Sequence, residues 1–589
     1  MRKSLLSLLA LLPMLAYAYD AKIDGIYYNF VGDEAFVTYQ ECIQVEQDGK
    51  TINKYVSDYT DDIIIPETVT YEGKTYRVTA IGNHAFRDCS EVTSVIIPES
   101  VDSIANGAFD SCSKLLSVNI PGGVTSIGKW AFYGCESLTS ITIPKGVKSI
   151  GKWAFFDCSS LTSVTIPESV DSIGEWTFSN CSSLTSVTIH EGVKSIGFAA
   201  FQCCTALTAV TIPESVISIG AQAFYSCSSL VSITIPESVI SIVDFTFADC
   251  TSLLSITIPK GVKSIGGTAF QGCSALVTVD IPETVETIGA WAFNGCTSLS
   301  SITIPDGLTS IEYATFAFCS SLPSINIPES VTSIEGCAFY RCTGLTSITL
   351  PNNLTSIDEA PFYGCTGLTS VTIPESVTNI GVCPFGGTGL TSIKVEEENP
   401  VYDSRGNCNA IIKTATNELV AGCQNTVIPD GITSINTWAF YECTGLTSVT
   451  IPEGVTAMYD YAFQDCPNLT SVTIPSTMTY IDVCVFMGCS NLTEFYCHAE
   501  NIPETQDNTF DGVPFASATL YVPASAIDKY KATEPWSNFG KILPLTTPID
   551  NILSDEPATR QSFYDLLGRK LSGKPARGIY IENGHKVLR

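Results

Sequence analysis

The chain has 589 residues, which is too long for a single hydrophobic core, so it must contain several domains or an array of repeats. Hydrophobic residues make up 45% of the composition and charged residues only 15%, and 60 acidic against 30 basic residues give a formal net charge of -30. A surface this acidic repels phosphate groups, which argues against nucleic acids and anionic lipid headgroups as partners.

The first residues have the pattern of a secretory signal peptide. Arg2 and Lys3 precede an apolar run over 5–15, and Ala-Tyr-Ala follows, ending at Ala18. A basic start, a short apolar core and small residues before the cleavage site identify such peptides. The run is too short to span a bilayer and no later stretch is long enough, so we expect no transmembrane segment. The mature protein, starting at Tyr19, is expected to be secreted, extracellular or on the outer cell surface.

A 23-residue period organises the middle of the chain. Sixteen of seventeen phenylalanines in this phase are followed three residues later by cysteine, and the exception has Thr388 there. Fixed self-similarity of this length indicates a solenoid of stacked repeats. The seventeen positions are Phe86, Phe109, Phe132, Phe155, Phe178, Phe201, Phe224, Phe247, Phe270, Phe293, Phe316, Phe339, Phe362, Phe385, Phe440, Phe463 and Phe486.

Each repeat begins with the alternation of a half-buried strand. Leu161, Val164 and Ile166 follow the L-x-x-L-x-L pattern, while Ser163 and Thr165 point outward. The next residue is a proline, which cannot donate to a strand ladder. This predicts one short strand and an irregular return arc per repeat. One copy buries too little to fold alone, so stacked copies must share an apolar interior.

These residues resemble the BspA-like leucine-rich-repeat surface proteins, whose repeats carry the same IPxxVxxIGxxAFxxC run, over about 63–501 of this chain. The resemblance implies a β-rich solenoid, a right-handed superhelix with parallel strands and terminal caps. It also implies adhesion to extracellular proteins or to other microbial cells. It does not imply particular ligand-contacting residues, because no fixed set defines the family.

The ends of the array and one interruption are also similar to parts of that family: IDGIYY to its N-terminal cap, 399–425 to its hairpin insertion and 519–530 to its C-terminal cap. The expected organisation is a signal peptide at 1–18, an N-terminal capping region at 19–62, repeats at 63–393, the hairpin insertion at 394–426, further repeats at 427–500, a C-terminal cap at 501–545 and a tail at 546–589.

The tail has two interpretations. Its segments FYDLLGR, from Phe563, and GIYIENG, from Gly578, are similar to the sorting signals of type IX secretion substrates, which would take the protein to the cell surface. The alternative is a small terminal β-hairpin without a targeting role.

Sixteen of the 24 cysteines occupy the repeat position. Stacking would place them about 5 Å apart in one inward column, which is within disulfide range. Free cysteine also behaves as a small buried hydrophobe, and we expect a ladder of buried thiols on that basis. Its members are Cys89, Cys112, Cys135, Cys158, Cys181, Cys204, Cys227, Cys250, Cys273, Cys296, Cys319, Cys342, Cys365, Cys443, Cys466 and Cys489.

Cys408 and Cys423, which flank the insertion, are the best disulfide candidates in an exported protein. We expect no metal site, because the chain has no C-x-x-C pair and only four histidines.

Trp130, Trp153 and Trp176 come from consecutive repeats, two residues before the repeat phenylalanine, and should form one aromatic stripe. Tyr133 and Phe156 would widen it. If exposed, this stripe is the candidate binding surface, because tryptophan dominates interface energetics. The alternative is that these rings pack as half-buried filler on the return arc.

Acidic residues also recur after the strand-ending proline, as at Glu191, Glu214 and Glu237. A bridging divalent cation is conceivable there, but we expect simple hydration.

The four histidines are scattered and catalytic motifs are missing. Cys497 and His498 are neighbours, but adjacent side chains of a strand face opposite ways. We therefore expect no enzyme and no cofactor.

The sequence predicts a monomeric adhesion or binding protein for an extracellular protein or glycan of unknown identity. Its contacts would use the aromatic stripe or the outward Ser/Thr columns. The alternative is a structural scaffold of the cell surface without a specific ligand. An ice-binding face is disfavoured because Asn119, Asp280 and Asn326 interrupt the Ser-x-Thr rows.

Overall fold

The computed structural model describes residues 19–47, 50–506, 508–545, 563–564, 579–582 and 585–588. The expected signal peptide, 1–18, lies outside these residues. The chain forms two compact units, Met1–Thr388 and Gly389–Arg589. No helix in the described part of the chain is long and apolar enough to cross a membrane.

The first unit begins with a small β-structure that closes the array. Tyr27 and Tyr28 are buried in it, and the ring of Tyr59 lies 4.6 Å from that of Phe86 in the first turn. Antiparallel strands lead into β8, and parallel pairing continues from there. The strands are β1 Ala21–Ile23, β2 Ile26–Val31, β3 Glu34–Thr38, β4 Glu41–Gln47, β5 Lys50–Val56, β6 Asp61–Ile64, β7 Thr68–Tyr71 and β8 Lys74–Ile81.

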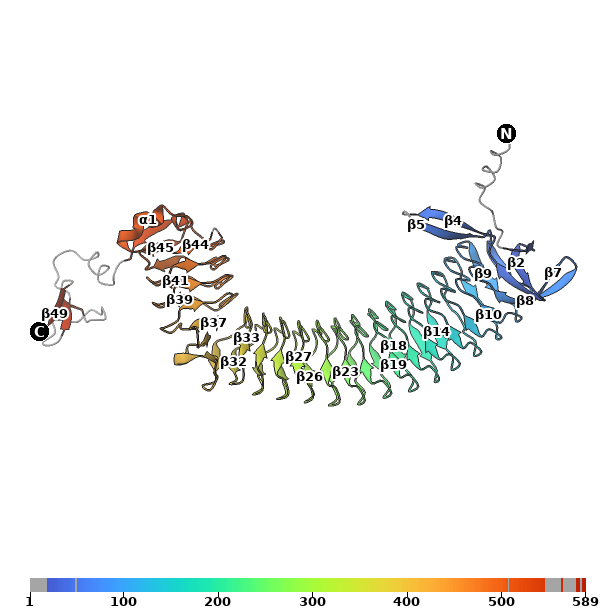
Figure 1. The fold of residues 1–589 in the computed structure, drawn as a ribbon, viewed down its shortest axis with the longest axis horizontal. Helices are drawn as coiled ribbons and strands as arrows, with labels where there is room; N and C mark the ends of the chain where they lie inside the picture. The colour runs from blue at the N-terminus through green and yellow to red at the C-terminus, as the bar shows by residue number, and fades with distance from the viewer. Residues whose placement is uncertain are drawn as a thin grey trace, which may run out of the picture. The chain divides into compact units, whose positions relative to one another are not determined.

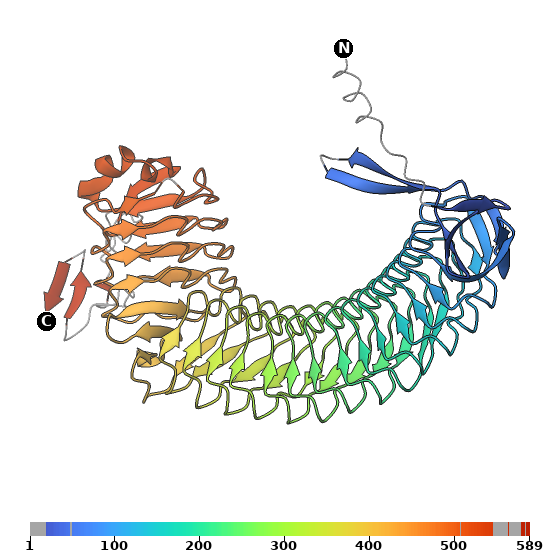
Figure 2. The same cartoon turned by 45° about the vertical axis from the view of Figure 1, so that its right-hand side comes forward.

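The rest of the first unit is a stack of 23-residue turns that follow a curved path (Figures 1 and 2). The predicted strand is present in most turns, with the alternating burial that its pattern indicates. Neighbouring turns pair in parallel, Ser163 opposite Ser186. These strands are β9 Val92–Ile96, β11 Ser117–Val118, β14 Ser163–Ile166, β16 Ser186–Ile189, β18 Ala209–Thr211, β20 Ser232–Thr234, β22 Ser255–Thr257, β24 Thr278–Asp280, β26 Ser301–Ile302, β28 Ser324–Asn326, β30 Ser347–Thr349 and β32 Ser370–Ile373.

The return arc contains a second, two-residue strand that the sequence pattern did not predict. The parallel-stranded repeat solenoid itself is confirmed. The second strands are β10 Ser103–Ile104, β12 Ser126–Ile127, β13 Ser149–Ile150, β15 Ser172–Ile173, β17 Ser195–Ile196, β19 Ser218–Ile219, β21 Ser241–Ile242, β23 Ser264–Ile265, β25 Thr287–Ile288, β27 Ser310–Ile311, β29 Ser333–Ile334, β31 Ser356–Ile357 and β33 Asn379–Ile380.

The second unit contains an antiparallel insertion, three further turns and a closing cap in which Tyr530 and Trp536 are fully buried. Its last three strands pair antiparallel. The elements are β34 Ser392–Val395, β35 Tyr402–Asp403, η1 Arg405–Asn407, β36 Ala410–Lys413, β37 Glu418–Gly422, β38 Ser434–Ile435, β39 Ser448–Thr450, β40 Ala457–Met458, β41 Ser471–Ile474, β42 Tyr480–Ile481, β43 Glu494–Cys497, β44 Glu504–Thr505, β45 Thr519–Val522, η2 Ala524–Ala526, α1 Ile527–Lys531, η3 Trp536–Asn538, β46 Lys541–Pro544, β47 Phe563–Tyr564, β48 Ile579–Glu582 and β49 His585–Leu588.

The repeat phenylalanines form the core of the array. From Phe86 to Phe362 each ring is fully shielded from solvent. Successive rings are nearly parallel, with centroids 5.0 Å apart between Phe86 and Phe109 and 5.8 Å apart between Phe293 and Phe316. Each ring therefore buries its faces against the turns before and after it, which no single repeat can achieve.

The repeat cysteines are buried free thiols. Fourteen of the sixteen also donate a hydrogen bond to the carbonyl of the phenylalanine in the preceding turn, at 2.9–3.3 Å. The Phe86 carbonyl, for example, accepts from the Cys89 amide of its own turn and from the Cys112 thiol of the next. The thiol therefore joins turns as well as filling space.

Burial raises the pKa of these thiols, to about 12 at Cys296 and Cys342. In the unfolded chain a thiol ionises near pH 8.5. A group whose pKa is higher in the folded state contributes stability that is complete below the unfolded pKa and is lost as the pH rises towards the folded one. We expect the urea midpoint under reducing conditions to fall steadily between about pH 8.5 and 11.

The double variant Cys296→Ala/Cys342→Ala is the control for this prediction, because tyrosines also titrate near pH 10. Its midpoint should depend on pH less steeply than that of the unmodified chain. Equal slopes would contradict the assignment to the thiols.

The second-strand sheet is interrupted at three regular places. Parallel pairing is missing between β13 and β15, β19 and β21, and β25 and β27. At most other turns of the array an amide donates to the isoleucine carbonyl 24 residues earlier, as from Gly151 to Ile127 at 2.8 Å. Within 128–381, all of which is described, this bond is missing at Gly174, Val243 and Glu312.

A threonine accompanies each interruption. Thr177, Thr246 and Thr315 stand before the repeat phenylalanine, where most turns have alanine, and they are 69 residues apart, or three turns. Each hydroxyl donates to the carbonyl of the residue whose amide has lost its bond, at 2.7–2.9 Å. A buried threonine needs more room than alanine, and we attribute the gap to that volume.

Local spacing agrees with this attribution. A Cβ atom built on Gly128 would lie 2.5 Å from the backbone of the preceding turn. At Gly174, after the first interruption, the corresponding distance is 3.3 Å. The turns are therefore further apart at Thr177.

We expect Thr246→Ala to close its gap and to restore the bond between the Val243 amide and the Ile219 carbonyl. Hydrogen exchange measured by mass spectrometry should then show slower exchange at Val243, by an amount corresponding to about 1 kcal/mol for one backbone bond. The reverse variant, Ala200→Thr, should speed exchange at Gly197. Unchanged exchange in both would show that the threonine does not cause the gap.

Candidate functional site

Each turn holds one residue in the left-handed backbone region two positions before its phenylalanine. This residue is Trp130 with φ 55°, Trp153 with φ 64° and Trp176 with φ 59°. At neighbouring turns the same position is Ala199 or Gln222, so the fold does not require tryptophan there. The left-handed region is unfavourable for residues with a Cβ, by about 1–2 kcal/mol. Large rings at this position add exposed apolar surface without a clear gain in folding.

Aromatic rings of four consecutive turns form one surface, which we call the Trp153 surface. The rings of Trp153 and Trp176 stack at 4.9 Å with an interplanar angle of 12°. A second stack joins Tyr133 and Phe156 at 5.0 Å, and Phe156 also contacts Trp153 at 5.1 Å. Contacts join the rings of Tyr133, Trp153, Phe156, Trp176 and Phe198. Trp130 has the same repeat position one turn earlier and is counted with the surface, but within the described residues its ring makes no contact with that of Trp153. The expected stripe of three stacked tryptophans therefore forms only between Trp153 and Trp176.

Phe198 extends the surface into a fourth turn and was missed in the sequence. Its ring lies 5.3 Å from that of Trp176, edge to face. The signal was present, because Lys129, Lys152 and Glu175 occupy the same repeat position in the three preceding turns, and Phe198 is aromatic there.

The Trp153 surface is partly open to solvent, and its first two turns are basic. Trp130 is 42% exposed and the other rings are half-buried. The two turns between Cys112 and Cys158 contain five lysines and two acidic residues, although the whole chain has a net charge of -30. Lys152 pairs with Glu175 of the next turn at 2.6 Å, and the two residues directly precede Trp153 and Trp176. The next two turns, between Cys158 and Cys204, contain one lysine and four acidic residues, so the surface is an apolar patch that is basic in its first two turns and acidic in its last two.

The expected Cys408–Cys423 disulfide is not formed, and both residues are free thiols. The antiparallel register pairs Ala410 with Gly422, which sets Cys423 opposite Asn409 and one position away from Cys408. The Cys423 thiol lies 3.4 Å from the Asn409 carbonyl. Side chains that are offset by one residue in a strand pair point to opposite faces. Cys408 and Cys423 therefore form no bridge, although they are close together along the hairpin.

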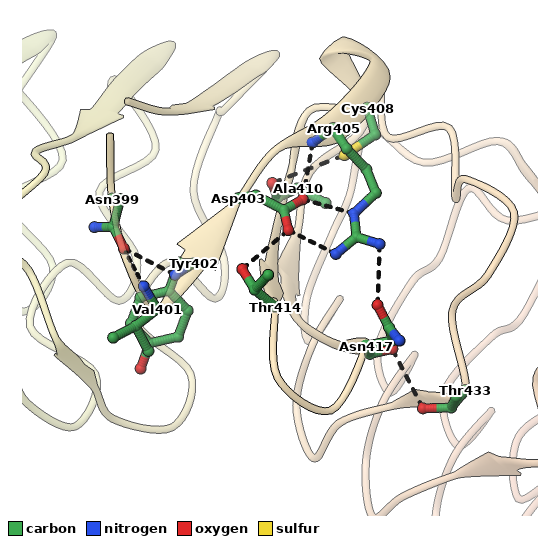
Figure 3. A network of polar contacts seen from close by, with 10 residues as sticks. All are labelled: Asn399, Val401, Tyr402, Asp403, Arg405, Cys408, Ala410, Thr414, Asn417 and Thr433. Atoms are coloured by element: carbon green, nitrogen blue, oxygen red, sulfur yellow. Dashed lines mark hydrogen bonds and ion pairs between the residues drawn. The ribbon is translucent and has the colours of Figure 1, made fainter. Parts of the chain in front are cut away.

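The insertion is held instead by a polar network around Asp403 (Figure 3). The Asp403 carboxylate accepts from the Arg405 guanidinium at 2.8 and 2.6 Å and from the Thr414 hydroxyl at 3.1 Å. Burial acts to raise the pKa of Asp403, but these bonds outweigh it and hold the pKa below its usual value. Arg405 also donates to Asn417 at 2.9 Å. Because these groups satisfy one another, the network stabilises the loop.

The column of carboxylates after the strand-ending prolines has a structural role that hydration alone does not describe. Glu237 accepts a backbone amide of the next turn from Lys260 at 3.2 Å, and Glu329 accepts one from Asn352 at 2.8 Å. In the described residues, no three His, Cys, Asp or Glu side chains are grouped to hold a metal ion.

The remaining titratable candidates are parts of the folded framework. The Cys497 thiol is buried 3.2 Å from the Tyr530 hydroxyl, and burial raises its pKa, which is the opposite of what an attacking thiolate needs. His84 stacks on Tyr55 at 4.2 Å, and burial followed by the charge of Arg87 lowers its pKa.

Solved structures of other proteins are similar to this arrangement of turns. A solved leucine-rich repeat protein from Bacteroides ovatus is 32% identical, with a TM-score of 0.58, and the match covers 66% of this chain and 97% of that one. A solved leucine-rich cell surface protein from Faecalibacterium prausnitzii is 30% identical, with a TM-score of 0.42, over 61% of this chain and 94% of that one. No curated protein matches the chain.

The family model described as "BspA type Leucine rich repeat region (6 copies)" matches residues 79–207, 194–320, 286–405 and 417–531. These ranges cover more than half of the chain, and with the parallel stacked turns they identify it as a member of the BspA-type leucine-rich repeat family.

Proposed function

We propose that this chain is an exported, non-catalytic binding protein that attaches to a partner protein through the Trp153 surface. The observation that carries this proposal is the placement of large aromatic rings at left-handed, solvent-accessible positions where alanine suffices elsewhere. Strained or exposed residues that do not serve folding are a reason to look for function.

The geometry of the rings favours a protein over a glycan. Sugars bind aromatic residues by lying on an open ring face. In this surface Trp153 and Trp176 cover one face of each other, and Tyr133 and Phe156 do the same. The stacks leave fewer open ring faces than isolated rings would, and Lys129 and Lys152 are adjacent in sequence to Trp130 and Trp153, which suits the aliphatic and acidic side chains of a protein interface.

Export is proposed from the sequence at both ends. Residues 1–18 have the signal-peptide pattern, and the tail at 546–589 is similar to type IX sorting signals. Location at the cell surface and adhesion, which the family resemblance implies, belong to this proposal, as does a monomeric state.

The mature chain should retain a specific protein from a panel of immobilised extracellular-matrix proteins and mucin glycans. Trp153→Ala should weaken retention at least about tenfold, since truncating a hot-spot tryptophan costs on the order of 2 kcal/mol. This variant should fold, because Ala199, Ala314 and Ala360 occupy the equivalent backbone position in other turns.

Trp438→Ala is the matched control, because Trp438 has the same left-handed position in a turn of the second unit and is not one of the residues of the Trp153 surface. It should change retention by less than about twofold. Equal losses in both variants would contradict the proposed site. Retention of glycans alone would contradict a protein partner, and retention of nothing would favour the scaffold alternative.

A further inference from the structure

The third interruption of the second-strand sheet opens a cavity of about 300 Å³. It lies between β25 and β27, where the Glu312 amide does not reach the Ile288 carbonyl. The turn that carries β27 also carries the first strand β26. On the side facing the next turn, β26 does not pair with β28, so the sheet of first strands is interrupted there as well. Pro323 explains this second loss, because it has no amide to donate.

Two carboxylates line this cavity. Glu286 and Glu312 come from the turns on either side of the gap, together with Ser264, Thr287 and Ser310. The Ser310 hydroxyl donates to the Glu312 carboxylate at 2.6 Å. The lost ladder bond also leaves the Ile288 carbonyl as an acceptor in the same wall. The wall therefore presents several hydrogen-bond acceptors, two of them charged.

The carboxylates distinguish this interruption from the other two. The residues equivalent to Glu286 are Lys148 and Ile217, and those equivalent to Glu312 are Gly174 and Val243, each 69 residues apart. The backbone gap comes from the threonine, but its charged lining is specific to the third occurrence. Glu286 already binds one cation, the Lys263 ammonium at 3.3 Å, with both groups exposed.

Aromatic rings follow directly after two lining residues. Trp291 and Tyr313 come after Ala290 and Glu312, and their rings are 5.4 Å apart at an angle of 51°. They are 39% and 45% exposed. Phe318, 41% exposed, lies five residues further on in the left-handed region, which bulky side chains rarely adopt.

The surrounding turns are strongly acidic. Residues 280–359 contain nine acidic residues and a single basic one, Arg341. This is opposite to the first two turns of the Trp153 surface, which have an excess of lysines. Carboxylates beside open aromatic rings attract a cation both by charge and by the ring quadrupole.

We propose that this cavity, with the rings of Trp291 and Tyr313, binds a lysine or arginine side chain from a basic segment of a protein partner. The cation lies between Glu286 and Glu312 and donates to their carboxylates and to the Ile288 carbonyl. The two rings contact the aliphatic stem or the face of the guanidinium. This site is separate from the Trp153 surface and does not depend on its function.

Fluorescence anisotropy with a labelled peptide that alternates glycine and arginine tests this proposal on the mature chain. The matched peptide carries citrulline, the neutral isostere of arginine. We expect the arginine peptide to bind and the citrulline peptide to bind at least about tenfold more weakly, because only the cation pairs with the carboxylates.

Glu312→Gln should weaken the arginine peptide about tenfold, and Tyr313→Ala several-fold. Glu375→Gln removes the same charge from an exposed site in a later turn and should change binding less than about twofold. Trp153→Ala should leave it unchanged. Equal effects of Glu312→Gln and Glu375→Gln would show attraction to general acidity and would overturn the proposal.

Two further outcomes would also overturn it. One is equal binding of the citrulline peptide. The other is concentration-dependent self-association of the chain that is lost in Glu312→Gln, seen by light scattering without peptide, because the surface would then belong to a second copy.

Discussion

Contact between consecutive turns is the interaction on which every other feature of this protein depends. A single 23-residue turn has two short strands and one inward phenylalanine ring. Alone, the strands would lack hydrogen-bond partners and the ring would be exposed to solvent. The phenylalanine rings are shielded only because each lies between two others at about 5 Å. The thiol of one turn donates to the phenylalanine carbonyl of the turn before it, as Cys181 does to Phe155. Stability in such a stack is shared between neighbours, and folding is expected to spread along it.

This arrangement separates the residues that build the solenoid from those that face a partner. The inward positions repeat almost without change, while the left-handed position two before the phenylalanine varies among Ala199, Gln222, Trp153 and Cys337. Substitution there leaves the backbone ladder intact, because only the amide and carbonyl are used. The position is therefore free to carry recognition, and stacking can bring equivalent aromatic side chains of consecutive turns into contact, as at Trp153 and Trp176.

The same dependence explains why a small change inside the stack reaches the surface. One threonine in place of alanine separates two turns and removes a ladder bond. At Thr177 and Thr246 the residues at the gap leave it uncharged or basic, whereas at Thr315 they line it with Glu286 and Glu312. Core volume and surface chemistry together produce the third cavity, and neither would do so alone.

The period, the inward phenylalanine and cysteine columns and the parallel stacking could be predicted from the sequence, because they repeat in one phase. The aromatic contact of Trp153 and Trp176 followed from their shared position. The thiol-to-carbonyl bonds and the second strand could not be predicted, since they depend on the path of the return arc. The predicted disulfide between Cys408 and Cys423 was wrong, because the register of the hairpin sets Cys423 opposite Asn409 and not opposite Cys408. The 69-residue spacing of threonines was visible but has no structural meaning until the gaps are known.

Hydrogen exchange of the mature chain, measured with and without a matrix protein that it retains, tests most directly where binding takes place. If the Trp153 surface is the contact, protection should be confined to amides of the return arcs in the four turns from Lys129 to Phe201. Protection along the first strands from β14 to β24, or spread evenly over the array, would contradict a binding site built on these aromatic rings.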